Sequence, residues 1–412
     1  MAIGALGVYV CLFMALYFEV FLLISFLEKK PAQKNSALPK RYPTVTIAVP
    51  SFNEERTIAG TLNSLLALTY PKDKLKIMVI DDGSRDNTRK IAEAFAMKHP
   101  QISYFHKENG GKWTALNFAI ERAATEYIGC LDADSFVAPD ALIEIIKKFE
   151  EDPAIHAIMP AMKVFHPRSI LERMQAVEYS FGVFYKKMFD NIGALNVLPG
   201  PFSFYKRSTF EKIGLFKHAH NTEDMEIAFR MHEHGLKIVN AHNAIVHTTV
   251  PKTVGALLKQ RTRWSQGFLE NSRDYAHMYF NKKYGNFGML VLPFGLFAFL
   301  AGLYTTAYLA ITLTQAAASD LLDMWATRLP PTYTFSWPQF EWFFLNTSMM
   351  TFTIIAVMGC TVTAILLGNK IAQSKLSVFS FLSYFALFGF IAPMWLATAV
   401  WGAARSRPAP WR

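Results

Sequence analysis

The sequence predicts an α/β fold in which a mostly parallel sheet, with helices on both faces, is joined to an α-helical transmembrane region. The first observation is the alternation of short β-prone segments with helical segments across residues 28–250. The second is a set of four long apolar runs around that region, each long enough for a bilayer core of ~30 Å. The third is the position of acidic motifs directly after predicted strands, where sheets of this class bind ligands.

The predicted elements of the α/β region follow one another at the spacing of a Rossmann-like sheet. Strands are expected at residues 44–49, 76–80, 102–106 and 127–131. Helices are expected at residues 54–68, 87–98, 112–124 and 139–149. Two later segments, 167–190 and 253–280, carry apolar residues in a helical stripe. The first fits equally well a helix packed on the domain core or one in the membrane interface, and the second is predicted to follow the bilayer surface.

The apolar runs predict four membrane segments and an orientation. Residues 1–27 are interpreted as an N-terminal transmembrane helix, because basic residues follow the run and no cleavage motif of a signal peptide is present. Those basic residues place 28–250 in the cytoplasm, followed by an interfacial region at 251–285. About three further helices are expected within 286–404, before a basic tail at 405–412. Four spans would put that tail outside, against the positive-inside rule, and the sequence leaves this open.

The amino-acid composition restricts the classes of partner that we expect. The formal net charge is +10, which suits a domain beside anionic membrane lipids and a nucleotide-diphosphate substrate. The basic residues are scattered and form no recognised binding motif, so nucleic acid is not an expected partner. Cys11, Cys130 and Cys360 are isolated, which excludes a disulfide framework and a cysteine zinc site. We therefore expect an integral protein of the plasma (inner) membrane whose catalytic domain is cytoplasmic.

Three motifs lie at the start of the α/β region, and two of them are suited to holding a nucleotide. Asp81 and Asp82 end a predicted strand, where a carboxylate can accept hydrogen bonds from a base or a ribose, although Asp-Gly is also a common turn. The segment of Pro50, Asn53 and Glu54 is explained by a turn and helix cap. Lys112 follows two glycines near a predicted helix start, where it can meet a phosphate.

Two pairs of acidic residues suggest catalysis. Asp132 and Asp134 lie on the same side of an extended chain, and two buried carboxylates without a cation would repel each other. Oxygen ligands of this kind suit Mg²⁺ or Mn²⁺, whereas the alternative is a polar loop. Glu223 and Asp224 precede a predicted helix, where Asp224 can act as a general base or can complete a helix-capping arrangement.

Residues 260–264 form the most informative motif. In a helix, Gln260, Arg263 and Trp264 share one face, which joins an amide, a fixed cation and a flat ring. Such a face can stack on a sugar and donate to phosphate oxygens, although an ordinary basic helix would look the same.

In this order, the motifs resemble those of the inverting, membrane-embedded, processive glycosyltransferases of family 2, which include cellulose, chitin, hyaluronan and poly-N-acetylglucosamine synthases. The resemblance spans residues 45–268 and implies a GT-A-like domain. It implies that Asp224, Glu223 and Arg263 are catalytic and that Asp134 binds the metal. It further implies a set of substrate-binding residues: Pro50, Asn53, Glu54, Asp81, Asp82, Lys112, Asp132, Gly200, Pro201, Gln260, Arg261 and Trp264.

The same resemblance implies a reaction. The expected function is polymerisation of a UDP-sugar, with UDP-N-acetylglucosamine favoured, into a β-linked polysaccharide that passes across the membrane. The expected partners are the UDP-sugar donor, Mg²⁺ or Mn²⁺, the growing polysaccharide or a lipid acceptor, and membrane lipids. The alternative is a non-processive enzyme that adds one sugar to a lipid acceptor.

Overall fold

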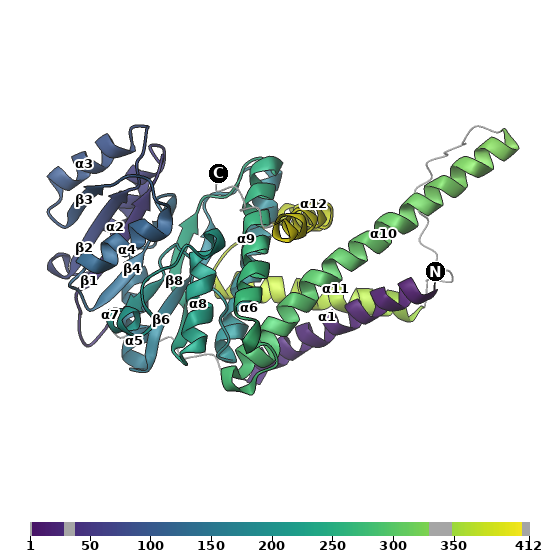
Figure 1. Cartoon of the computed structure of the whole chain (residues 1–412), viewed down its shortest axis with the longest axis horizontal. Coiled ribbons are helices and arrows are strands. Elements are labelled where there is room, and N and C mark those ends of the chain that lie inside the picture. Colours follow the sequence, from purple (N-terminus) through teal and green to yellow (C-terminus); the bar gives the residue numbers. More distant parts are fainter. Residues whose placement is uncertain (1, 29–37, 329–347, 406–412) are drawn as a thin grey trace.

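The computed structural model describes residues 2–28, 38–328 and 348–405 and consists of an α/β domain joined to long helices (Figure 1). The sheet and its short helices lie at one end of the molecule, and the long helices extend away from the other end. Helices α6 (Ile170–Asn191) and α9 (Val254–Asp274) stand between these two parts. This arrangement confirms the predicted combination of an α/β domain with an α-helical apolar region.

Eight strands form one sheet in the order β3-β2-β1-β4-β7-β6-β8-β5. Four of the seven strand pairs are parallel, and the three antiparallel pairs are those of β7 with its two neighbours and of β5 with β8. The predicted parallel sheet is therefore found at the β3-β2-β1-β4 end, whereas the other end is mixed. The strands are β1 (Val45–Ser51), β2 (Leu75–Asp81), β3 (Ile102–His106), β4 (Tyr127–Cys130), β5 (Ser135–Val137), β6 (Ile155–Val164), β7 (Phe204–Lys206) and β8 (Lys237–Thr248).

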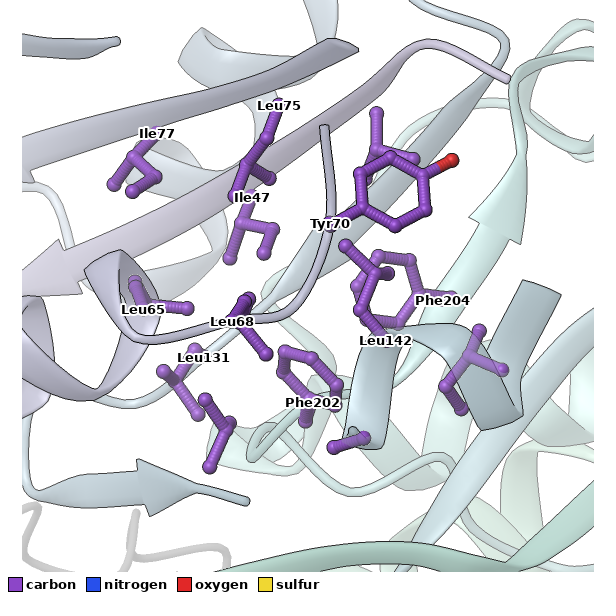
Figure 2. Close-up of a cluster of buried hydrophobic side chains, with 14 of the residues drawn as sticks. Ile47, Leu65, Leu68, Tyr70, Leu75, Ile77, Leu131, Leu142, Phe202 and Phe204 are labelled. Carbon is purple, nitrogen blue, oxygen red and sulfur yellow. The ribbon is translucent and has the colours of Figure 1, made fainter. Parts of the chain in front are cut away.

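Helices cover both faces of the sheet because buried strand side chains alternate between two cores. In β1, Ile47 and Val49 belong to one core, whereas Ala48 belongs to the other. Figure 2 shows the first core, to which Ile47 contributes from the sheet and Leu65 and Leu142 contribute from two different helices. The helices are α2 (Ile58–Leu66) and α5 (Ala141–Glu151) on this core, α4 (Lys112–Arg122), α7 (Arg207–Ile213) and α8 (Glu223–Glu233) on the other, and α3 (Thr88–Lys98) beside β3.

Helix α6 joins the domain to the apolar helices. Ser169 and Glu172 form a capping box that fixes where the helix begins. Its apolar stripe includes Met174 and Val177, which pack in one cluster with Ile365 and Trp395 of the long helices. The helix also contacts β6 and β8 of the sheet. Its amphipathic pattern is therefore explained by packing between the sheet and the long helices.

Within the described residues, four helices are long and apolar enough to cross a membrane. They are α1 (Ala2–Glu28), α10 (Leu292–Thr327) with the π-helical turn before it, α11 (Met349–Ile371) and α12 (Val378–Ala404). Residues 329–347 of the expected 286–404 region and most of the expected 405–412 tail lie outside the described residues. At ~1.5 Å per residue, the 36 residues of α10 exceed the thickness of a bilayer core.

Helices α6 and α11 approach each other closely at Gly368. A Cβ atom at Gly368 would overlap the backbone oxygen of Ser180 and press against the Phe184 side chain. Gly359, on the same helix, has nothing within 4 Å of its Cβ position. The two glycines therefore separate the effect of close helix contact from the effect of adding a methyl group to α11.

We predict that Gly368→Ala destabilises the protein by about 1–3 kcal/mol, the usual cost of overpacking, because a backbone oxygen cannot rotate away as a side chain can. Gly359→Ala is the matched control and should be neutral or slightly stabilising, since alanine favours helix. Thermal unfolding of both purified variants in detergent checks this. Equal melting temperatures for the two variants would contradict the close contact between α6 and α11.

Candidate active site

The carboxyl ends of β1, β2 and β4 and the first turns of α4 and α8 meet at one edge of the sheet. Parallel strands bring their carboxyl ends to the same edge, which explains why motifs distant in the sequence converge. The sequence-predicted acidic residues lie at these ends: Asp81 and Asp82 at the end of β2, Asp132 and Asp134 after β4, and Glu223 and Asp224 in the first turn of α8.

Asp81 and Asp82 are both buried and serve to shape the loops around them. Asp81 accepts hydrogen bonds from the Ser84 backbone (2.9 Å) and the Tyr104 hydroxyl (2.9 Å). Burial alone would raise the pKa of Asp81, but hydrogen bonds from Ser84, His106 and Tyr104 outweigh it and lower the pKa. Asp81 therefore remains a carboxylate at neutral pH.

Asp82 organises the glycine loop that precedes α4. Its carboxylate accepts from the backbone amides of Gly110 (3.0 Å) and Gly111 (2.9 Å) and from the Lys107 ammonium (2.5 Å). Gly111 has a φ of 91°, a conformation that favours glycine. Asp82 thus fixes the loop that delivers Lys112 to the site.

The loop after β1 interlocks with the loop after β2. Asn53, with a φ of 56°, accepts a hydrogen bond from the Arg85 backbone (2.9 Å), and the Glu54 amide donates to Thr88 (2.7 Å). Pro50 lies inside β1 and is buried. The structure thus places Asn53 and Glu54 at the site edge, while Pro50 supports the strand beneath.

Lys112 is the central cation of the site. Its ammonium lies 2.5 Å from the Asp132 carboxylate and 3.7 Å from that of Glu223. Burial alone would lower the pKa of Lys112, but attraction to these two acids outweighs it and raises the pKa. A Cβ atom at Gly200 would overlap the Lys112 ammonium and crowd Asp132, and Pro201 beside it is buried. The predicted Gly200-Pro201 loop therefore closes over this ion pair.

Asp132 and Asp134 present oxygen ligands for a divalent cation. The Asp132 side chain is 29% exposed, and the Asp134 carboxylate accepts a hydrogen bond from the Ser135 hydroxyl (3.1 Å). Across residues 2–28, 38–328 and 348–405, no cluster of three or more His, Cys, Asp or Glu side chains could hold a metal. However, Mg²⁺ is commonly bound by one or two carboxylates, with substrate phosphates and water as its other ligands. Asp132 and Asp134 therefore fit a metal that arrives with a diphosphate.

Glu223 and Asp224 lie next to this ion pair. Asp224 is not part of a capping box, because the residue before α8 is Thr222 and its side chain makes no capping hydrogen bond to the backbone of that helix. Burial raises the pKa of Asp224, and the nearby Glu223 carboxylate raises it further, against the opposing effects of Lys112 and Arg263. A carboxylate with a raised pKa is a stronger base, which suits proton abstraction.

Helix α9 holds the segment that leads into these acids. Ala219, His220 and Asn221 all have φ values between 41° and 60°, an unfavourable conformation for residues other than glycine. Arg263 donates to the Asn221 backbone oxygen (2.8 Å), and Asn271 donates to the Thr222 hydroxyl (2.9 Å). The predicted helix at 253–280 is confirmed as α9, and its Arg263 lies close enough to Asp224 to lower its pKa.

The other residues of the α9 motif differ from one another in their exposure and contacts. Gln260 and Trp264 are partly exposed, whereas Arg261 is 3% exposed. Arg261 donates to Glu178 of α6 (2.8 Å) and to Gln260 (2.9 Å), and its guanidinium lies 4.1 Å from the centroid of the Trp264 ring. The contacts of Arg261 in this arrangement are therefore with other side chains of the protein.

Sequence reasoning missed three charged residues near the site. Lys107 binds Asp82, and Glu178 binds Arg261. Burial lowers the pKa of Lys186 to about 8, while the nearby Asp224 carboxylate opposes this effect. Glu178 and Lys186 are both polar positions of the amphipathic 167–190 segment. A search for charges beside its apolar stripe could have drawn attention to them.

Comparisons with known proteins agree with this geometry. Residues 46–214 match the sequence model of Glycosyl transferase family 2. A poly-beta-1,6-N-acetyl-D-glucosamine synthase of Staphylococcus epidermidis is 29% identical over 381 residues, covering 91% of this chain and 88% of the relative. A synthase of the same name from Staphylococcus aureus (strain COL) is 35% identical over 224 residues, which cover 54% of each protein.

A solved structure shares the fold over nearly the whole chain. It is that of a mannosyltransferase from Pyrobaculum calidifontis in complex with GDP-Man and Mn²⁺. The TM-score is 0.66 at 21% identity, with 98% of this chain and 99% of that chain covered. At this identity the match bears on the fold alone, and it confirms the GT-A-like fold expected from the sequence.

The Glu223→Gln variant distinguishes the roles of the two neighbouring acids. If Asp224 accepts the proton, it must be ionised, so activity falls as the pH drops through its raised pKa. Removing the Glu223 charge lowers the pKa of Asp224, and the acid limb of kcat/KM should move to lower pH. We expect Glu223→Gln to retain activity at neutral pH, with a loss well below the ~10²–10⁴-fold typical of a lost general base.

The measurement is the pH profile of UDP release from UDP-N-acetylglucosamine by wild-type and variant proteins. A loss of activity at every pH in Glu223→Gln would instead identify Glu223 as the base.

Proposed function

Because residues 46–214 match the model of Glycosyl transferase family 2, we propose that this chain is a glycosyltransferase of that family that polymerises N-acetylglucosamine from UDP-N-acetylglucosamine into a β-linked polysaccharide. The donor and product are supported by the poly-beta-1,6-N-acetyl-D-glucosamine synthases, which are similar over most of the chain. The observation that carries the proposal is the partly buried array of Lys112, Asp132, Glu223, Asp224 and Arg263 at the carboxyl edge of the sheet.

The proposed donor site lies along β1, β2 and β4. Asn53, Glu54, Asp81 and Asp82 shape the loops that receive the uridine, as described above. Lys112 supplies a positive charge at the first turn of α4, where backbone amides also point outward. Diphosphate binding at this position would place the leaving group beside a fixed cation and lower the barrier to its departure.

The proposed chemistry is a single inverting displacement. Asp224 accepts the proton of the acceptor hydroxyl while that oxygen forms the new bond to the anomeric carbon. The bond between this carbon and the diphosphate oxygen breaks, and UDP leaves. Arg263 lies near Asp224 and is anchored to the Asn221 backbone, so its guanidinium is fixed in place to stabilise negative charge.

We propose that Asp134, with Asp132, holds Mg²⁺ or Mn²⁺ together with the diphosphate of the donor. The mannosyltransferase of similar fold was solved with Mn²⁺, which supports a divalent cation without selecting one. When bound, such a cation neutralises charge on the departing diphosphate. For Asp132 to join it, the Lys112 ammonium has to share or release this carboxylate.

The four apolar helices support an integral membrane protein. We propose that it resides in the plasma (inner) membrane with the catalytic domain in the cytoplasm, since basic residues cluster after α1. The growing polysaccharide would leave through the helical region, to which α6 and α9 connect the site.

The test uses purified full-length protein in nanodiscs with Mn²⁺ or Mg²⁺ and UDP-N-acetylglucosamine, UDP-glucose or UDP-glucuronate. We expect UDP release with UDP-N-acetylglucosamine and a product of many residues. Asp224→Asn keeps the shape of the side chain but removes the base, so its rate should fall by ~10²–10⁴-fold.

Product size separates this proposal from the main alternative. Single-sugar or lipid-linked products would favour a non-processive transferase. Full activity of Asp224→Asn would contradict the assignment of the base without contradicting polymerisation.

A further inference from the structure

An ion pair between a buried arginine and a partly exposed glutamate links the two helices that join the catalytic domain to the apolar helices. Arg261 of α9 is 3% exposed, and its guanidinium lies 2.8 Å from a Glu178 carboxylate oxygen on α6. These residues are 83 positions apart in the sequence. A buried guanidinium is costly without an anion, so Glu178 permits Arg261 to occupy this position.

Arg261 in turn contacts two side chains of the site motif. One nitrogen donates to the Gln260 amide oxygen at 2.9 Å, which fixes the orientation of that amide. Its guanidinium carbon lies 4.1 Å from the centroid of the Trp264 ring, within the range of a cation–π contact. Arg261 thus covers one face of the indole, and a ligand can stack only on the face that it leaves.

The exposure of these residues indicates which of them can contact a ligand and which hold the others in position. Gln260 and Trp264 are partly exposed and able to meet a substrate, whereas the buried Arg261 faces Glu178 and Gln260. Tyr179, the neighbour of Glu178, also lies close to both Arg261 and Asp134, so this cluster adjoins the proposed metal site. Arg263, by contrast, lies near the base and holds the Asn221 backbone.

We propose that Glu178 and Arg261 are positioning residues that set the Gln260 amide and the Trp264 ring for the acceptor sugar. The proposal assigns Arg261 a role different from direct substrate binding, and it adds Glu178 to the functional residues. It rests on the proposed function, since it assumes that the Trp264 ring stacks on the acceptor end of the saccharide.

The substitution Arg261→Lys tests this directly. Lysine retains a charge for Glu178 but lacks the planar fork that reaches Gln260 and stacks on Trp264. With N-acetylglucosamine oligosaccharides as acceptors, we expect the acceptor KM to rise about tenfold or more, consistent with a change of ~1.4 kcal/mol or more. The KM for UDP-N-acetylglucosamine should change less than twofold, because the contacts of Arg261 are with Glu178, Gln260 and the Trp264 ring.

Glu178→Gln should produce the same split between acceptor KM and donor KM. The matched control is Thr398→Val, which removes another contact of α9, the 2.7 Å hydrogen bond between Thr262 and Thr398. Thr398→Val should leave both KM values unchanged. Melting temperatures in detergent identify any variant that has lost its fold, and Arg261→Lys keeps the test decisive if Glu178→Gln does not fold.

Several results would overturn the inference. One is an unchanged acceptor KM in folded Arg261→Lys. Another is an equal rise of donor KM and acceptor KM, which would favour a direct role in donor binding or a general loss of structure. Wild-type protein that makes no polymer would contradict the proposed function, and the inference would then be tested by transfer of a single sugar.

Discussion

The partly buried ion pair between Lys112 and Asp132 is the constraint on which the rest of the site depends. Two carboxylates, Asp132 and Glu223, lie close together where burial penalises charge, and the Lys112 ammonium between them offsets their repulsion. The need to place the Lys112 ammonium between these carboxylates explains the conformation of the surrounding loops. Asp82 holds the glycine loop that delivers Lys112, and a side chain at position 200 would overlap the pair.

The second constraint is the close packing of α9 against the segment before α8. A Cβ atom at Gly267 would overlap the Thr222 side chain, so glycine lets the helix approach the segment that carries Glu223 and Asp224. On another side, α9 contacts α12 through Thr262 and Thr398. One helix therefore touches both the segment that bears the proposed base and a helix long enough to span the membrane. Through α9, a shift of the apolar helices would reach Glu223 and Asp224.

Much of the fold and part of the site could be predicted from the sequence. Strand segments and their acidic ends were predictable because side-chain periodicity and strand termini are local features. The convergence of Lys112, Asp132 and Asp224 followed from the parallel strands and from the resemblance to family 2. The insertion of β7 between β4 and β6 was not predictable, because this strand has only three residues and follows Phe202, which has a φ of 65°.

The role of Arg261 was beyond sequence reasoning for a different reason. The helical pattern places Gln260, Arg263 and Trp264 on one face but gives no information on the partner of Arg261. That partner, Glu178, lies on another helix and is recognised only once α6 and α9 are side by side. Likewise, Asp81 and Asp82 were predicted to contact the nucleotide, and the structure adds their hydrogen bonds to protein groups. Sequence motifs identify residues that can take part in the reaction more readily than the residues that hold them in position.

The electrostatics of the site suit a base that works near neutral pH. Burial and the Glu223 charge raise the pKa of Asp224, whereas Lys112 and Arg263 lower it. With the cations alone, Asp224 would be a weak base; with burial alone, it would hold its proton over much of the working pH range. The opposing effects leave a carboxylate that is ionised at neutral pH yet has a raised affinity for a proton. If the same cations meet the diphosphate, as proposed, donor binding would draw positive charge away from Asp224 and strengthen the base when the acceptor is in place.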